Sequence, residues 1–202
     1  ERLFRREPDY LGRDALSQGH CSQGCSRKLT EESEVAKNLT AKPRVGILMG
    51  SDSDLEVMRE TEKRLDYFGI AYETRIMSAH RTPDKAAKYA ATAQERGLEV
   101  IIAGAGAAAH LAGAIAANTT LPVIGIPIDS SSLKGLDALL ATVQMPAGIP
   151  VATMAIGKAG AAHAGIFAAQ IVSRKEANVA PKLRCFKKEM DEGVEDRDRK
   201  LQ

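Results

Sequence analysis

Short apolar runs alternate with longer helical segments five times between residues 43 and 177, and this alternation constrains the fold more than any other feature. The runs end at polar or glycine-containing segments, which is typical of strands buried on both faces of a parallel sheet. Five β-α units in a row predict an α/β fold with three layers, α/β/α, around a five-stranded parallel sheet. The predicted strands are 44–50, 71–77, 99–105, 121–128 and 149–157, and the predicted helices are 54–69, 82–97, 107–118, 133–145 and 159–177.

Residues at the ends of these helices support the assignment. The helix 54–69 starts near an acid and stops at Gly69, a residue that readily takes the left-handed conformation of a helix C-cap. In the next helix, Thr82 stands at the cap position and Pro83 in the first turn, where its missing N–H costs nothing.

The two ends of the chain differ from this central part, and we divide the chain into three segments. Residues 1–42 form a polar extension without sustained periodicity, which we expect to be mostly disordered with a short helix near 30–37. We expect residues 43–175 to form the α/β domain, and residues 176–202 to form a densely charged C-terminal helix or tail whose last residues fray. In the extension, His20, Cys21 and Cys25 fall short of the closed ligand set of a structural zinc site, so no metal is expected.

Composition excludes several classes of partner. The net charge of +2, from 28 basic and 26 acidic residues, gives no strong attraction to nucleic acid or anionic lipid, and no apolar stretch is long enough to span a membrane. Three cysteines cannot all pair with one another, and a reducing, cytoplasmic setting is the simpler interpretation.

Polar and glycine-rich sequences follow every predicted strand. Because ligands of open parallel sheets bind beyond the carboxyl ends of the strands, these segments can converge on one site. After the first strand, "GSDSD" (50–54) offers the hydroxyls of Ser51 and Ser53 and the carboxylate of Asp54, which suit a phosphate and ribose hydroxyls. The alternative is that Ser53 or Asp54 only caps the following helix.

The segment "AGAGAAAHLAG" (103–113) contains Gly104, Gly106 and Ala109 at the spacing of a loose dinucleotide-binding fingerprint, with Asp129 at the end of the next strand. However, this loop follows the third strand rather than the first. The alternative is a turn of small residues that lets helix and sheet pack closely, with His110 as a packed histidine.

The most informative segment is "SAHRTP" (78–83). Arg81 presents a planar fork that matches phosphate oxygens, and Ser78 adds a donor. A histidine at a strand end, here His80, is suited to carry a proton to and from a substrate, although an ordinary packed ring remains the alternative. Motifs for ATP binding, zinc hydrolysis or a serine nucleophile are missing from the sequence. The pattern therefore predicts phosphate and ribose binding with proton transfer, without ATP or a metal.

Taken together, "GILMGSDSD", "SAHRTPD", "VIIAGAGAAAHLAG", "LPVIGIPI", "GLDALLATVQMPAGIPVAT" and "AIGKAGAAHAGIFAAQI" resemble the PurE family of purine biosynthesis, over roughly residues 43–172. The resemblance implies a flavodoxin-like, doubly wound fold, a homo-octamer, and no cofactor. It also implies an isomerase, N5-carboxyaminoimidazole ribonucleotide mutase, which moves a carboxyl group from N5 to C4 of an imidazole. The family's other branch carboxylates aminoimidazole ribonucleotide with CO2 directly; it tends to carry lysine in place of Arg81 and to lack His110.

The resemblance also assigns roles to individual residues. The family's catalytic histidine falls on His80, and its substrate-binding residues fall on Ser51, Asp54 and Arg81. By the same comparison, further substrate-binding positions are Ser53, Ser78, Gly104, Ala105, Gly106, Ala107 and His110. Ala107 and Ala112 stand where the family usually has Gly and Pro, and neither change removes a group that the chemistry needs. Two alternatives to the mutase remain: the direct carboxylase, and a non-catalytic nucleotide-binding regulatory module.

Overall fold

The computed structural model describes residues 42–202, and the apolar runs form the predicted parallel sheet. The strands are β1 (Val45–Met49), β2 (Tyr72–Ile76), β3 (Val100–Gly106), β4 (Val123–Ile128) and β5 (Ala152–Thr153). They lie in the order β2-β1-β3-β4-β5, and every neighbouring pair is parallel. This is the flavodoxin-like doubly wound order, whose winding reverses between β1 and β3. The expected fold is confirmed.

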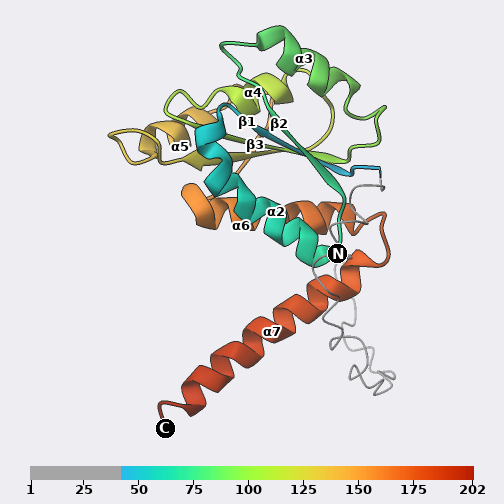
Figure 1. Cartoon of the computed structure of the whole chain (residues 1–202), viewed down its shortest axis with the longest axis vertical. Helices are drawn as coiled ribbons and strands as arrows, with labels where there is room; N and C mark the ends of the chain where they lie inside the picture. The colour runs from blue at the N-terminus through green and yellow to red at the C-terminus, as the bar shows by residue number, and fades with distance from the viewer. Residues whose placement is uncertain (1–41) are drawn as a thin grey trace, which may run out of the picture.

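Helices cover both faces of the sheet, giving the three layers visible in Figure 1. On one face, α2 (Leu55–Phe68) and α6 (Gly157–Val172) enclose a core that includes Ile47, Ile102 and Phe68. On the other face, α3 (Pro83–Thr92), α4 (Leu111–Ala116) and α5 (Leu136–Val143) cover a second core around Leu48 and Ile101. Alternate residues of β1 thus enter opposite cores, because successive side chains of a strand point to opposite faces.

Small residues let α2 and α6 approach each other closely. A Cβ at Gly165 would lie 2.9 Å from the carbonyl oxygen of Thr61, and the buried Thr61 hydroxyl donates a 2.8 Å hydrogen bond to the carbonyl of Ala161. The alanine-rich sequence of α6 therefore serves close packing on α2 within this chain.

Several predicted boundaries were wrong. The helix predicted over 107–118 is the shorter α4, because Ala107 has a positive φ of 49° and helix geometry begins only after His110. The strand predicted over 149–157 reduces to the two residues of β5, which pair only with Ile124 and Gly125 at the sheet edge. A short 3-10 helix, η1 (Asp52–Asp54), precedes α2.

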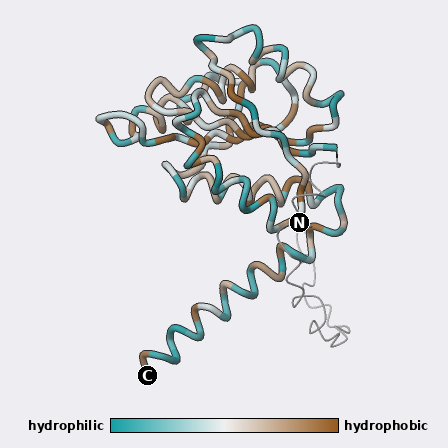
Figure 2. Tube along the Cα trace, in the orientation of Figure 1, coloured by the Kyte–Doolittle hydropathy of each residue, from teal (hydrophilic) through white to brown (hydrophobic). Residues whose placement is uncertain are grey.

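The charged C-terminal segment forms one continuous helix, α7 (Val179–Arg199), that extends away from the three layers (Figure 1). Its first turns pack Phe186 edge-on against Tyr67 and Phe68, while teal, hydrophilic residues dominate its far half in Figure 2. An ion pair between Lys188 and Glu192 at 3.4 Å supports that half, and the helix ends at Arg199, three residues before the end of the sequence.

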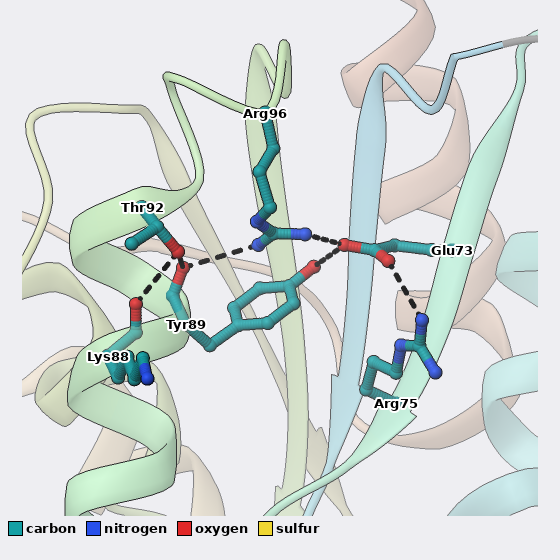
Figure 3. A network of polar contacts seen from close by, with 6 residues as sticks. All are labelled: Glu73, Arg75, Lys88, Tyr89, Thr92 and Arg96. Atoms are coloured by element: carbon teal, nitrogen blue, oxygen red, sulfur yellow. Dashed lines mark hydrogen bonds and ion pairs between the residues drawn. The ribbon is translucent and has the colours of Figure 1, made fainter.

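A polar network ties α3 to the sheet (Figure 3). Glu73 of β2 accepts a 2.9 Å hydrogen bond from the Tyr89 hydroxyl. It also accepts a hydrogen bond from Arg96, with which it forms an ion pair. Arg75 adds a weaker contact at 3.3 Å, and Arg96 stacks on the Tyr89 ring. Because α3 directly follows the "SAHRTP" segment, this network helps to fix that segment against the sheet.

The predictions for the N-terminal extension, a helix near 30–37 and no metal at His20, Cys21 and Cys25, concern residues outside the part that the structure describes. Within residues 42–202, no helix is both long and apolar enough to cross a membrane.

Candidate active site

The segments after β1, β2, β3 and β4 meet around one cavity of about 380 Å³ at the carboxyl edge of the sheet. Eight of the predicted site residues line it: Ser51, Ser53, Asp54, Ser78, His80, Arg81, Ala105 and Gly106. The winding reversal between β1 and β3 opens this crevice, which is where doubly wound sheets bind ligands. The convergence expected from the strand ends is present for four of the five strands, since no described residue after β5 lines the cavity.

After β1, a tight turn presents two hydroxyls and a buried carboxylate. The Ser51 hydroxyl accepts a hydrogen bond from the Ser53 N–H at 3.3 Å, so Ser51, not Ser53 or Asp54, provides the side-chain cap here. Asp54 is only 6% exposed although it lines the cavity. Burial raises the pKa of this carboxyl, while hydrogen bonds from Ser51, Ser53 and Gly50 oppose the shift. A carboxyl group that lies buried in a cleft, despite the desolvation cost of its charged form, is a candidate for ligand binding.

After β2, Ser78 and Thr82 build the turn that carries His80 and Arg81. The Ser78 hydroxyl accepts from the N–H groups of His80 and Arg81, at 3.3 and 3.2 Å. Thr82 does not cap α3 with its side chain as expected: its hydroxyl accepts from the Ser78 N–H at 2.9 Å and donates to the Ser78 carbonyl. The two hydroxyls hold the turn rigid, so the orientation of His80 and Arg81 is set by local backbone geometry.

Two contacts then fix the functional side chains. Arg81 donates from Nη2 to the Gly50 carbonyl at 2.8 Å, which leaves other guanidinium N–H groups for a ligand. His80 Nε2 lies 2.9 Å from Nδ1 of His110, with the two rings nearly perpendicular. One of these nitrogens donates the hydrogen and the other accepts it, so a hydrogen bond joins two side chains that lie 30 residues apart in the sequence.

The remaining predicted residues lie behind or beside the cavity. Gly104 is buried in the sheet, where a Cβ would lie 2.4 Å from the Met58 sulfur. Ala107 is exposed at the β3–α4 turn, and His110 reaches the site through its contact with His80. Neither these three residues nor Asp129 line the cavity, so the dinucleotide arrangement of glycine loop and ribose-binding acid does not form.

Sequence reasoning missed five lining residues: Gly50, Ala79, Ala108, Leu111 and Ser130. The first two adjoin predicted residues, and Leu111 begins α4. Ser130 lies in the "IDSSSLKG" segment after β4, where strand-end position was the available signal.

The arrangement combines anion binding with proton transfer. Arg81, Ser51 and Ser53 suit phosphate oxygens, Asp54 suits hydroxyl donors, and His80 with His110 can take up or release a proton. Within residues 42–202, no three His, Cys, Asp or Glu side chains are grouped to hold a metal ion.

Comparison with known proteins identifies the family of this site. The model of the AIR carboxylase family matches residues 44–193. Curated N5-carboxyaminoimidazole ribonucleotide mutases are similar over most of their length. The protein of Vibrio vulnificus is 56% identical over 151 residues, 75% of this chain and 94% of its own. That of Bacillus subtilis is 58% identical over 142 residues, covering 70% and 88%. That of Pyrococcus horikoshii is 55% identical over 161 residues, covering 80% and 90%.

A solved structure agrees with the sequence comparisons. The crystal structure of Treponema denticola PurE superposes with a TM-score of 0.71 at 28% identity, covering 79% of this chain and 99% of that protein. A doubly wound sheet, a cavity built from the predicted motifs and matches over three quarters of the chain lead to one conclusion. This chain belongs to the AIR carboxylase family, the family of the PurE proteins.

Proposed function

We propose that this chain is an isomerase of purine biosynthesis, an N5-carboxyaminoimidazole ribonucleotide mutase, as its curated relatives are named. The observation that carries this proposal is the 2.9 Å contact between His80 and His110, beside Arg81. Arg81 and His110 are the two residues by which the sequence resembles the mutase branch of the family rather than the direct carboxylase. Arg81 lines the cavity, and His110 contacts His80, which also lines it.

The reaction needs one group that acts first as an acid and then as a base. In the first step, the bond between N5 and the carboxyl carbon breaks, CO2 leaves, and His80 gives a proton to N5. In the second step, C4 of the imidazole attacks the CO2, and His80 takes the C4 proton, which restores its starting protonation state. The proton that His80 gives to N5 is matched by the proton that it takes from C4. The reaction needs no external energy source, because the cavity holds the CO2 and the imidazole together.

Other residues then bind and orient the substrate. Arg81, Ser51 and Ser53 hold the phosphate, and Asp54 accepts from ribose hydroxyls. Ser78 holds its turn by accepting hydrogen bonds from two backbone N–H groups, and its own O–H remains a donor for the phosphate. The backbone of Ala105 and Gly106 forms the floor on which the imidazole lies.

Conversion of N5-carboxyaminoimidazole ribonucleotide to the C4-carboxylated isomer, without ATP or added bicarbonate, tests this proposal. We expect the unmodified chain to catalyse it and His80→Asn to lose at least 100-fold in kcat, the usual size of an acid–base contribution. Turnover only with aminoimidazole ribonucleotide and bicarbonate would identify a direct carboxylase instead. Near-full turnover by His80→Asn would refute the proposed acid–base role.

We further infer that the chain assembles into a homo-octamer. Three large apolar side chains one turn apart on α5 support association: Leu136, Leu140 and Val143 are 52%, 49% and 48% exposed. Light scattering after size exclusion should give eight times the chain mass of 21.6 kDa. A monomer would contradict this inference.

We also infer a cytoplasmic location, because the substrate is a phosphorylated metabolite that does not cross membranes unaided. Cell fractionation should find the chain with cytoplasmic enzymes, and recovery from an exported fraction would contradict this.

A further inference from the structure

Ser130 is the only contribution of the segment after β4 to the cavity lining in the described part of the chain. Its hydroxyl lies against Gly106, where a Cβ would be 1.7 Å from Ser130 Oγ and 2.8 Å from its Cβ. Any side chain at position 106 would therefore displace this hydroxyl. The missing Cβ of Gly106 lets Ser130 reach the cavity floor.

The strand order places Ser130 far from the phosphate-binding side. Across the carboxyl edge, the cavity residues follow the order β2, β1, β3, β4, so Arg81 stands on the β2 side and Ser130 on the β4 side. Among the lining residues of the described chain, Arg81 is the one lysine or arginine, and it attracts the phosphate. A ribonucleotide whose phosphate lies at Arg81 extends its imidazole across Gly106 toward Ser130.

We propose that Ser130 is a specificity-determining residue whose hydroxyl donates a hydrogen bond to the carboxyl group carried by the imidazole. This inference rests on the proposed mutase function. It identifies the Ser130 hydroxyl as the group by which the site distinguishes a carboxylated nucleotide from one without the carboxyl group. A serine hydroxyl donates one hydrogen bond, and a carboxylate is the strongest acceptor on the base end of the substrate. No lysine or arginine among the described lining residues stands on this side to neutralise that carboxylate.

The experiment compares the binding of two ligands by calorimetry: 4-carboxy-5-aminoimidazole ribonucleotide, the proposed reaction product, and aminoimidazole ribonucleotide, which lacks the carboxyl group. Ser130→Ala should weaken binding of the carboxylated nucleotide about tenfold or more, the size expected for losing a hydrogen bond to a charged group. Its affinity for aminoimidazole ribonucleotide should change less than twofold. Ser132→Ala, at an exposed neighbouring serine that does not line the cavity, is the matched control and should bind both ligands normally.

A second comparison separates the carboxyl end from the phosphate end. Arg81→Lys should weaken both ligands by similar factors, because both carry the phosphate. If Ser130→Ala also weakened both equally, or weakened neither, Ser130 would not contact the carboxyl group and the inference would be wrong. In either case a mutase activity of the unmodified chain would leave the proposed function standing. An unmodified chain that bound neither nucleotide would refute the proposed function, and the inference with it.

Discussion

Gly46 of β1 and Tyr89 of α3 offer a stringent test of how α3, and with it the loop that carries His80, is held on the sheet. A Cβ added at Gly46 would lie 2.3 Å from the Tyr89 hydroxyl oxygen, closer than such contacts allow. It would lie at a tolerable 3.3 Å from Cζ of the same ring and from Leu98. The Tyr89 hydroxyl is thus the main obstacle to a Cβ at position 46. The same hydroxyl donates a hydrogen bond to Glu73 in Figure 3.

From these distances we estimate how much each substitution changes the free energy of unfolding. Gly46→Ala should lower the free energy of unfolding by about 2 kcal/mol through overpacking. Tyr89→Phe should lower it by about 1.5 kcal/mol, because the ionised Glu73 loses a hydrogen bond. In the Tyr89→Phe background the obstacle is gone, so Gly46→Ala should cost only about 0.5 kcal/mol more. The coupling between the two positions is then about 1.5 kcal/mol.

Urea unfolding of the four proteins at pH 7 and one fixed chain concentration measures this coupling. The reference is the unmodified chain, and equal m-values confirm that the variants unfold from the same folded state. If the two single-variant costs add to within about 0.5 kcal/mol, the Tyr89 hydroxyl is not the obstacle and the reasoning is wrong.

Further predictions concern the site. His110→Leu should lower kcat at least tenfold with a smaller change in KM, since His80 loses the partner that orients its ring; steady-state kinetics test this, and an unchanged kcat would contradict it. Burial holds the pKa of Asp54 above its usual range, so the folded chain binds that proton more tightly than the unfolded chain does, and ionisation costs stability as the pH rises above about 3.8. Asp54→Asn should therefore raise the urea midpoint at pH 7 while weakening substrate binding, and a lower midpoint would count against the burial argument. Ala107→Gly should raise stability by about 0.5 kcal/mol, because relief of the left-handed conformation at φ 49° slightly exceeds the entropy cost of glycine. A fall in the urea midpoint of this variant would show that the turn is not strained.

Position at a strand end was enough to find most of the cavity from the sequence. Parallel strands deliver their carboxyl ends to one edge, so Ser51, Asp54, His80 and Gly106 could be grouped without knowing how the strands are ordered. The lengths of α4 and β5 could not be read in this way. Where a helix or strand stops depends on backbone geometry and on pairing partners, such as the left-handed Ala107.

The sequence by itself determined the alternation of strands and helices, the two apolar faces of the sheet, and the placing of hydroxyls, carboxylate, arginine and histidine after the strands. These follow from the local periodicity of apolar residues and from the chemistry of single side chains. Only the tertiary structure decided which strand ends are neighbours. The chain order of the strands is not their order in the sheet, because packing of the helices on both faces selects β2-β1-β3-β4-β5 from the possible arrangements. That order brings His80 to 2.9 Å from His110 and sets the Ser130 hydroxyl against Gly106, which are contacts between distant parts of the chain that no local pattern encodes.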